Sequence, residues 1–205
     1  MLDAYFFRRW MTATASAVDR EAGRLTELDS AIGDADHGSN LRRGFAAVTA
    51  ALDEAGPSAP GDVLALAGRT LISTVGGASG PLYGTLLRRT AKALGPEPGV
   101  SADQLRRALV EGVEAVGRLG GARPGDQTMI DALVPAVAAL EESFAAAAGA
   151  ALAGAEGTVP MRARKGRASY LGERSVGHQD PGAASAALLM AALAETAAAT
   201  VGGVR

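Results

Sequence analysis

The chain lacks cysteine altogether and has few of two other residue types that often carry chemistry. Its 205 residues include only two histidines, and aromatic residues make up 4%. Without thiols the chain forms neither disulfides nor thiolate metal sites, and two histidines are too few for a histidine-rich zinc site. A domain of this length buries roughly 70% of its unfolded surface, so it needs no disulfide to fold. The absence of cysteine is typical of a reducing compartment, and we expect a cytoplasmic protein.

The chain also lacks a strong excess of charge and a long apolar run. Its formal net charge is −2, which argues against a broad attraction to nucleic acid or anionic lipid. The N-terminal sequence MLDAYFFRRWM does not have the basic and then apolar regions of a signal peptide. The apolar run Ala145–Leu152 is too short and too weakly apolar to cross a membrane. We therefore expect one soluble domain, residues 1–205, with no nucleic-acid or membrane partner.

What the sequence does contain is a strong helical signal. Three stripes of apolar residues at helical spacing each predict a helix: Val18, Ala22 and Leu25; Leu105, Leu109, Val113 and Val116; Leu133, Val137, Leu140 and Phe144. The second helix opens with the capping-box pattern Ser101-Ala-Asp-Gln104. The first stripe lies in a helix expected over residues 3–27, and further helices are expected over 39–55, 61–75, 82–94 and 183–201. Since no segment alternates like a strand, the sequence predicts an all-α bundle with antiparallel neighbours.

Acidic residues are concentrated in one short segment. Asp29, Asp34 and Asp36 fall within eight residues, and two glycines nearby allow a tight path. Three close carboxylates repel one another, so a bound cation is the simplest compensation, and oxygen ligands favour Mg²⁺ or Ca²⁺. The segment lacks the ligand spacing of an EF-hand, which favours Mg²⁺. The alternative is that Asp36 or Ser39 caps the following helix while the other carboxylates are solvated.

A glycine-rich segment, Gly76-Gly-Ala-Ser-Gly-Pro-Leu-Tyr-Gly84, precedes another helical segment. Backbone N–H groups at such a turn can point at a phosphate, and Ser79 adds a hydroxyl donor. No Gly-Lys-Ser/Thr follows and no strand precedes, so the segment is neither a Walker A motif nor a dinucleotide fingerprint. The alternative is a turn between helices whose glycines permit close packing.

A third segment, residues 121–131, combines turn residues with a helix start. Asp126 or Thr128 can cap the following helix, which is the simplest interpretation. Met129 can either fill the core or offer a soft surface to a flat base.

A fourth segment, residues 165–182, gathers cations, hydroxyls and turn residues. Arg174 carries a planar guanidinium that suits phosphate, and Asp180-Pro-Gly is a turn and helix-start signal. The alternatives are that Arg174 forms a surface ion pair with Glu173 or another neighbour, and that His178 only hydrogen-bonds backbone.

Together these segments resemble the ADP-binding L subunit of dihydroxyacetone kinase, and the resemblance covers most of the chain. It is carried by LDSAIGDADHGSN, GGASGPLYGT, RPGDQTMIDAL and KGRASYLGERSVGHQDPGAAS, in this order. The last motif is the most discriminating. The resemblance implies a barrel of about eight antiparallel amphipathic helices with the nucleotide at one end.

The resemblance also implies the residues of the site. Asp29, Asp34 and Asp36 would hold two Mg²⁺ ions that bridge the diphosphate. The nucleotide would be bound by His37, Gly38, Ser39, Asn40, Ala78, Ser79, Gly121, Met129, Arg174, Asp180, Pro181 and Gly182. Arg174 would also act catalytically, by neutralising phosphate charge during transfer. The chain departs from the family at Gln127, where lysine is common.

The function that the resemblance implies is that of a kinase subunit. Phosphoryl transfer would run from Mg-bound ADP/ATP to dihydroxyacetone, which is held on a separate K subunit because 205 residues leave no triose-binding domain. Separate subunits favour the type in which ADP stays bound as a coenzyme and a phosphohistidine protein of the phosphotransferase system recharges it. The expected partners are the K subunit and this phosphoprotein, and the family also offers a transcription regulator as a partner.

Three alternatives remain open at this point. One is an L-type subunit of an ATP-dependent kinase for a related ketose such as erythrulose. Another is a nucleotide-sensing regulatory subunit. The third is a catalytically silent helical bundle that binds Ca²⁺.

Overall fold

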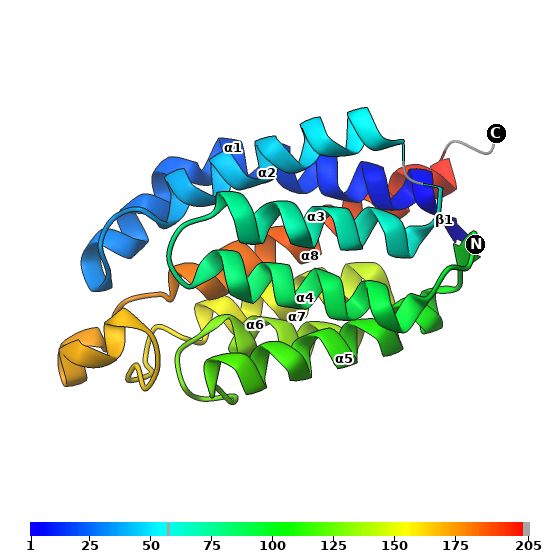
Figure 1. Ribbon diagram of the computed structural model, residues 1–205. Coiled ribbons are helices and arrows are strands. Elements are labelled where there is room, and N and C mark those ends of the chain that lie inside the picture. Colours follow the sequence, from blue (N-terminus) through cyan, green and yellow to red (C-terminus); the bar gives the residue numbers. More distant parts are fainter. Residues whose placement is uncertain (57, 203–205) are drawn as a thin grey trace.

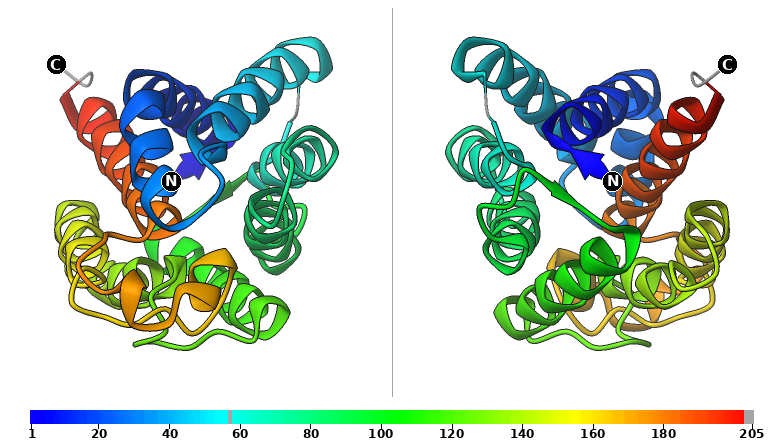
Figure 2. Two further views of the ribbon diagram at one scale, coloured as in Figure 1. Left: turned by 90° about the vertical axis from the view of Figure 1, so that its left-hand side faces the viewer. Right: turned by 90° about the vertical axis from the view of Figure 1, so that its right-hand side faces the viewer.

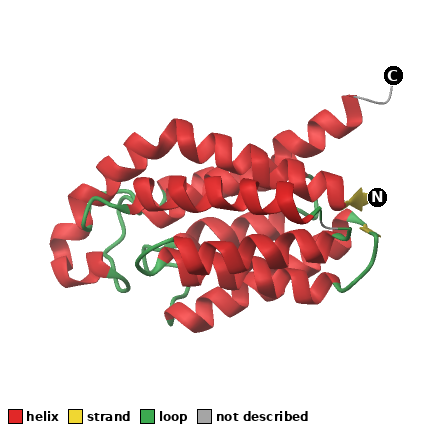
Figure 3. Cartoon of the chain, turned by 45° about the horizontal axis from the view of Figure 1, so that its top comes forward, coloured by secondary structure: helices red, strands yellow, loops and turns green. Residues whose placement is uncertain are grey.

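The computed structural model describes residues 1–56 and 58–202, and nearly all of its regular structure is helical (Figure 3). Its α-helices are α1 (Ala4–Ile32), α2 (His37–Ala55), α3 (Pro60–Thr74), α4 (Ser79–Leu94), α5 (Ala102–Gly120), α6 (Met129–Ala139), α7 (Phe144–Glu156) and α8 (Pro181–Gly202). A 3-10 segment, η1 (Arg167–Ser175), precedes α8, and the two-residue strands β1 (Leu2–Asp3) and β2 (Gly99–Val100) pair antiparallel. The prediction of an all-α fold with about eight helices is confirmed.

The helices are arranged around a common axis and share two ends. They lie side by side along the length of the molecule (Figure 1), and an end-on view shows them surrounding the axis (Figure 2). The connections α1–α2, α3–α4 and α5–α6 lie with η1 at one end, and the β1–β2 pair lies at the other (Figure 1). The four polar segments of the sequence are therefore gathered at one end of the bundle.

One large cluster of buried apolar side chains fills the space between the helices. Five of the eight aromatic residues lie in this cluster, among them Trp10, whose indole N–H donates to the carbonyl of Leu189 at 2.9 Å. Small residues let the helices approach closely: a Cβ on Gly154 of α7 would lie 2.2 Å from the carbonyl oxygen of Asp131 in α6. Close backbone approach thus compensates for the scarcity of large side chains.

The last helix, α8, is long and apolar enough to cross a membrane by length and composition alone. In the structure it packs within the bundle, and Ala183, Ala186, Leu189, Met190 and Leu193 are buried in the main cluster. Burial along the helix on this scale is the pattern of a core helix.

Local signals explain several helix boundaries, and one predicted helix is interrupted. The predicted capping box is present, since Ser101 Oγ accepts from Gln104 N–H at 3.1 Å and Gln104 Oε1 accepts from Ser101 N–H at 2.8 Å. The single helix predicted from Leu133 to Phe144 is wrong, because α6 ends at Ala139 and α7 begins at Phe144. Ser143 caps the new helix by accepting from Ala146 N–H at 2.9 Å. The apolar stripe continues across the break because Leu140 and Phe144 both contact the same core.

Candidate functional site

Three carboxylates converge where α1 ends and α2 begins. Asp29, Asp34 and Asp36 each offer an oxygen atom, and these atoms lie within 4.8 Å of one another. Asp29 is buried in the last turn of α1, whereas Asp34 and Asp36 are exposed. Oxygen ligands at this density fit a magnesium ion.

The backbone of the α1–α2 connection is shaped around Asp29. Its Oδ2 accepts from the N–H groups of Asp36 at 2.9 Å and His37 at 3.1 Å, so one carboxylate fixes the start of α2. Glycine is required at position 33, because a Cβ there would lie 2.0 Å from Asp29 Oδ1. Ala35 has a positive φ of 61°, which side chains disfavour. Strain of this kind is typical of functional loops.

The α3–α4 connection brings an uncapped helix start to the same place. Ala78 precedes α4 and has no polar side chain with which to cap it. The first N–H groups of a helix have no partner within the helix, so Ser79 and Gly80 offer free donors at its positive end. Such a terminus is suited to a phosphate group.

A buried chain of hydrogen bonds lies behind Ser79. His37 Nδ1 is 3.1 Å from Ser79 Oγ, and His37 Nε2 is 2.9 Å from Ser185 Oγ in α8. The hydroxyl of Tyr83 is 2.7 Å from Ser185 Oγ. Burial lowers the pKa of His37, although the carboxylates of Asp29 and Asp36 oppose the shift. Burial also raises the pKa of Tyr83 well above its usual range.

The α5–α6 connection ends in a capping box that the sequence did not specify uniquely. Thr128 Oγ1 accepts from Ile130 N–H at 3.2 Å, and Asp131 Oδ2 accepts from Thr128 N–H at 2.8 Å. Asp126 instead accepts from Arg123 N–H at 3.0 Å. Thr128 is therefore the cap, and Met129, the first residue of α6, is buried.

Gln127 occupies an unusual position between these residues. It is buried, has a φ of 59°, and its Nε2 lies near three carbonyl oxygens: Thr158 at 3.2 Å, Ser175 at 3.2 Å and His178 at 2.7 Å. An amide has only two N–H bonds for these three acceptors. Gln127 Oε1 is buried without a hydrogen-bond partner among the described residues.

The fourth segment leads into α8 as its turn signal predicts. Asp180 Oδ2 accepts from Ala183 N–H at 2.6 Å, and Pro181 is the first residue of α8. Burial raises the pKa of Asp180 to about 7, and the nearby carboxylates of Asp131 and Asp29 add to the shift. A buried carboxyl therefore lies near two other carboxylates at this end of the bundle.

The η1 segment contributes cations to this end of the bundle. Arg167 Nη2 lies 3.0 Å from Asp34 Oδ2. Glu173 pairs with Arg162 at 3.0 Å. The alternative ion pair of Arg174 with Glu173 is not found among the described residues, and Arg174 is exposed. The backbone carbonyl of His178 accepts from Gln127 Nε2 at 2.7 Å.

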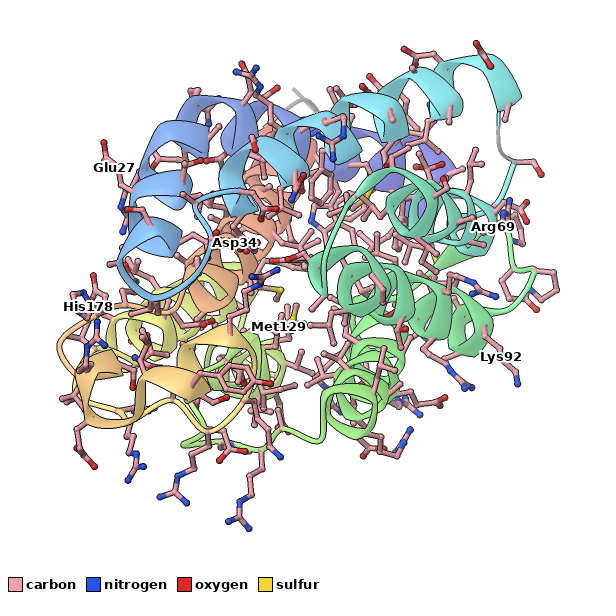
Figure 4. All side chains as sticks on the ribbon, turned by 60° about the vertical axis from the view of Figure 1, so that its left-hand side comes forward. Glu27, Asp34, Arg69, Lys92, Met129 and His178 are labelled. Atoms are coloured by element: carbon pink, nitrogen blue, oxygen red, sulfur yellow. The ribbon has the colours of Figure 1, made fainter. Side chains whose placement is uncertain are left out.

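All these segments border one cavity of about 400 Å³. Such a volume falls within the usual range of ligand sites. The three carboxylates and the start of α4 lie on its polar side, and its apolar wall comprises Leu82, Val116, Leu119, Ala122, Met129 and Ile130. In Figure 4, Asp34 and Met129 lie at this end, whereas Glu27 is directed away from it. The cavity thus combines a cation site, an anion site and an apolar wall, which is what a Mg-bound nucleotide needs.

Most of the predicted site residues line this cavity. They are Asp29, Asp34, Asp36, His37, Ala78, Ser79, Met129, Asp180, Pro181 and Gly182. Five predicted residues do not line it within the described part of the chain: Gly38, Ser39, Asn40, Gly121 and Arg174.

The five residues outside the cavity have other surroundings. Gly38 faces α1, where a Cβ would lie 2.0 Å from the carbonyl of Ala22. Ser39 Oγ donates to the carbonyl of Asp36 at 2.9 Å, and Asn40 Oδ1 accepts from Arg43 at 2.7 Å. Gly121 ends α5 with a left-handed φ of 58°. Nucleotide contacts by these residues and Arg174 stay predictions.

Sequence reasoning missed several residues of the site. Tyr83 and Ser185 lay within quoted motifs without an assigned role, and the contact of Ser185 with His37 joins residues 148 positions apart. The pairing of Arg167 with Asp34 likewise joins two motifs distant in sequence. The apolar wall was only implicit in the stripe that ends at Val116.

The comparisons with known proteins agree with this geometry. A DAK2 domain is recognised over residues 31–195. The chain is 44% identical over 195 residues to the phosphoenolpyruvate-dependent dihydroxyacetone kinase ADP-binding subunit DhaL of Escherichia coli, covering 90% of this chain and 93% of that subunit. It is 41% identical to the L-erythrulose 1-kinase of Mycolicibacterium smegmatis, covering 86% of this chain and 33% of that enzyme.

A solved structure shares the fold. The crystal structure of the dihydroxyacetone kinase from C. freundii in complex with AMP-PNP and Mg²⁺ matches with a TM-score of 0.73 and 30% identity, covering 92% of this chain and 33% of that chain. The chain thus spans about a third of the length of that kinase and of the erythrulose kinase, but nearly all of the E. coli subunit. It belongs to the DAK2 domain family.

Proposed function

We propose that this chain is the ADP/ATP-binding subunit of a dihydroxyacetone kinase, of the type that depends on the phosphotransferase system. The observation that carries the proposal is one cavity bordered by the Asp29, Asp34 and Asp36 carboxylates, the uncapped start of α4 and an apolar wall. Its relatives include the ADP-binding subunit of E. coli, and the C. freundii kinase was solved with AMP-PNP and Mg²⁺.

Each group of residues has a distinct task in this proposal. The three carboxylates hold two Mg²⁺ ions, which neutralise the phosphate charge when bound. The N–H groups of Ser79 and Gly80 hold a phosphate at the start of α4. The apolar wall, with Met129 at the start of α6, receives the base. Phosphoryl transfer depends on positioning and charge neutralisation, so this set requires no covalent help from the chain.

The proposal assigns the acceptor and the donor to other proteins. Dihydroxyacetone is held on a K subunit, and a phosphohistidine protein of the phosphotransferase system recharges ADP while it stays bound. Arg174 is exposed beside this end of the bundle, where it can reach a phosphate shared with a partner. The complex works in the cytoplasm. A transcription regulator is a further partner of this chain.

The experiment has two parts. Mass spectrometry of the small molecules released on denaturing the purified protein is expected to find ADP. A coupled assay is expected to show no turnover of free dihydroxyacetone by the chain alone, and turnover once a K-type subunit and the phosphoprotein are added. Absence of bound nucleotide, together with no binding of added Mg-ADP, contradicts the proposal. Robust turnover by the isolated chain contradicts the subunit assignment.

A second candidate is a kinase subunit for erythrulose, favoured by the 41% identity to an L-erythrulose 1-kinase. The chain spans only 33% of that enzyme. Replacing dihydroxyacetone by erythrulose in the same coupled assay separates the two candidates. A higher kcat/KM for erythrulose would favour the second.

A further inference from the structure

A second hollow lies between α3, α4 and α5, with a volume of about 870 Å³. One of its lining residues, Asp62, is acidic, and five are basic. Two of the basic residues, Arg69 and Lys92, are labelled in Figure 4 and lie on the same side of the molecule. We call this surface the basic groove, after its five cations from three helices: Arg69, Arg88, Arg89, Lys92 and Arg118.

Close packing of the three helices brings these cations together. A Cβ on Gly68 of α3 would lie 2.9 Å from the carbonyl of Gly84 in α4 and 2.6 Å from Arg88 Cγ. On the other side of α4, a Cβ on Gly112 of α5 would lie 2.9 Å from the carbonyl of Leu86. The backbones therefore approach closely on both sides of α4, and the basic side chains of all three helices share one surface.

The positive charge of the basic groove is largely uncompensated. Arg118 pairs with Glu114 at 3.4 Å. The other four cations are exposed and form no ion pair within residues 1–56 and 58–202. Arg88 and Lys92 lie four residues apart on one face of α4, where like charges destabilise a helix. Because this arrangement does not support the fold, we look for its role in recognition.

The length and the lining of the basic groove favour an acidic protein surface over other anions. From Thr85 to Gly95 the groove follows α4 for about 15 Å, at a rise of about 1.5 Å per residue. A single phosphate contacts only part of this length. Single-stranded nucleic acid stacks its bases on aromatic rings, and no aromatic residue of the described chain lines the groove.

The basic groove adjoins the cavity described above. Leu119 lines both of them, next to Arg118 in the last turn of α5. From there the groove continues to Gly95 and Pro96, beyond the C-terminal end of α4. These two ends of the groove lie toward opposite ends of the bundle (Figure 1). A protein that lies along the groove therefore also reaches the cavity.

We infer that the basic groove docks the phosphohistidine donor protein, through an acidic surface beside the reactive histidine of the donor. This inference rests on the proposed function. Of the two protein partners in that proposal, only the donor brings an anionic group to the cavity, because dihydroxyacetone is uncharged. An array of cations raises the rate at which an oppositely charged partner arrives.

The same charges also favour departure of the donor after transfer. Recharging breaks the N–P bond of the phosphohistidine and forms a P–O bond to ADP, so the phosphoryl group stays with the nucleotide. The donor then leaves less negative than it arrived. The basic groove thus binds the charged donor more strongly than the discharged donor.

The test measures the two half-reactions separately. In the first, a donor protein phosphorylated from phosphoenolpyruvate recharges the ADP-loaded chain. In the second, the ATP-loaded chain transfers to dihydroxyacetone on the K subunit. The double variant Arg88→Gln, Lys92→Gln removes two cations of the groove. We expect its kcat/KM for recharging to fall about tenfold at low ionic strength, and the difference to shrink at about 0.5 M salt. Transfer to the K subunit is expected to stay unchanged.

A matched control separates the position of the charges from their number. The double variant Arg20→Gln, Arg42→Gln lowers the net charge equally, but its two exposed sites lie in α1 and α2, outside the groove lining. It is expected to be recharged at the parent rate. Asp62→Asn removes the acidic residue of the groove and is expected to raise kcat/KM. Melting temperature and the Kd of Mg-ADP are expected to match the parent protein in both double variants.

The outcomes distinguish the inference from the proposed function. Equal recharging of the parent protein and the groove variant overturns the inference, and so does an equal loss in the control. A loss in the K-subunit half-reaction makes the K subunit the occupant and overturns the assignment to the donor. If the parent protein binds ADP but the donor does not recharge it, the proposed donor is wrong and the inference fails with it. A parent protein that binds no ADP refutes the proposed function itself.

Discussion

Arg167 of η1 forms an ion pair with Asp34, with 3.0 Å between Nη2 and Oδ2. The guanidinium neutralises one of the three clustered carboxylates, so a divalent ion and Arg167 compete for Asp34. Both side chains are partly or largely exposed, at 71% for Arg167 and 36% for Asp34. An exposed pair of this kind contributes only about 0–1 kcal/mol.

Loss of Arg167 is therefore expected to strengthen binding of a metal ion alone. Arg167→Met should lower the Kd of Mn²⁺ by about two- to fivefold, since about 1 kcal/mol corresponds to roughly fivefold. Titration followed by electron paramagnetic resonance, without nucleotide, measures the affinity. Arg162→Met is the control, because Arg162 pairs with Glu173 rather than with the cluster. A Kd that rises in Arg167→Met would show that Arg167 supports the metal site instead of competing for it.

Removal of Asp34 itself is expected to have the opposite effect. Asp34→Ala deletes a metal ligand, so Mg-ADP should stabilise this variant less than the parent protein. Ligand at 100 times its Kd stabilises a protein by roughly 2.7 kcal/mol, and most of this gain should disappear. The shift of melting temperature on adding Mg-ADP measures it. Glu27→Ala is the matched control, since Glu27 is exposed in α1 and directed away from the cavity (Figure 4). Equal shifts in all three proteins would rule out a metal role for Asp34.

The raised pKa of Asp180 predicts a dependence of stability on pH. In the folded protein the carboxyl titrates at about 7, whereas an unfolded aspartate titrates at about 3.9. The folded state thus holds a proton that the unfolded state has released, and the resulting stability is lost as pH rises from about 4 through about 7. Asn at this position stays neutral and can still accept from Ala183.

The comparison of Asp180→Asn with the parent protein checks this prediction. In a chelator, the melting temperature of the parent protein should fall between pH 5 and pH 8 by several degrees more than that of the variant, since about 1 kcal/mol corresponds to roughly 2–4 °C at this size. Bound Mg²⁺ should reduce the difference, because a nearby cation favours the carboxylate. Parallel curves in the chelator would mean that Asp180 titrates normally.

Gln127 provides a connected prediction. Gln127→Leu leaves three carbonyls without their common donor, and loss of a donor to a buried acceptor costs about 1–3 kcal/mol. Gln127→Lys places an ammonium with three donors before the same three carbonyls. Because Thr158 contacts both Gln127 and the backbone of Asp180, the lysine should also lower the pKa of Asp180. The melting temperature of Gln127→Leu is expected to lie well below that of the parent protein. The melting temperature of Gln127→Lys is expected to change little between pH 5 and pH 8. A pH dependence in Gln127→Lys equal to that of the parent protein would contradict the coupling.

Local sequence patterns predicted those parts of the fold that depend on neighbours along the chain. The Ser101–Gln104 box and the start of α8 after Asp180 follow from side chains that reach three residues ahead. The break between α6 and α7 was missed because apolar spacing reports which side chains face the core, and Leu140 and Phe144 face it although the helix is interrupted. Periodicity does not distinguish one helix from two that share a buried face.

The sequence likewise revealed some features of the site and not others. The acidic segment and the glycine-rich turn were visible because each concentrates its chemistry within a few residues. The contacts of His37 with Ser185 and of Arg167 with Asp34 depend on how α8 and η1 are placed against α1 and α2, which no local pattern specifies. Ser39 and Asn40 are adjacent to His37 in sequence, but their side chains bond Asp36 and Arg43 and they are not among the described residues that line the cavity, so their nucleotide contacts stay predictions.

Arg174 is expected to act on phosphate charge rather than on folding. It is exposed in η1, where an isolated surface ion pair would contribute only about 0–1 kcal/mol. A planar guanidinium near a diphosphate can make two parallel hydrogen bonds, which lysine cannot reproduce. Arg174→Lys should therefore slow phosphoryl transfer, and Arg174→Met should slow it further because the charge is also lost. Single-turnover transfer from the nucleotide-loaded protein to a substrate-loaded K subunit measures this, alongside circular dichroism melting without nucleotide. Wild-type transfer rates in both variants would make Arg174 an ordinary surface residue, and melting far below the parent protein in both would make it a structural one.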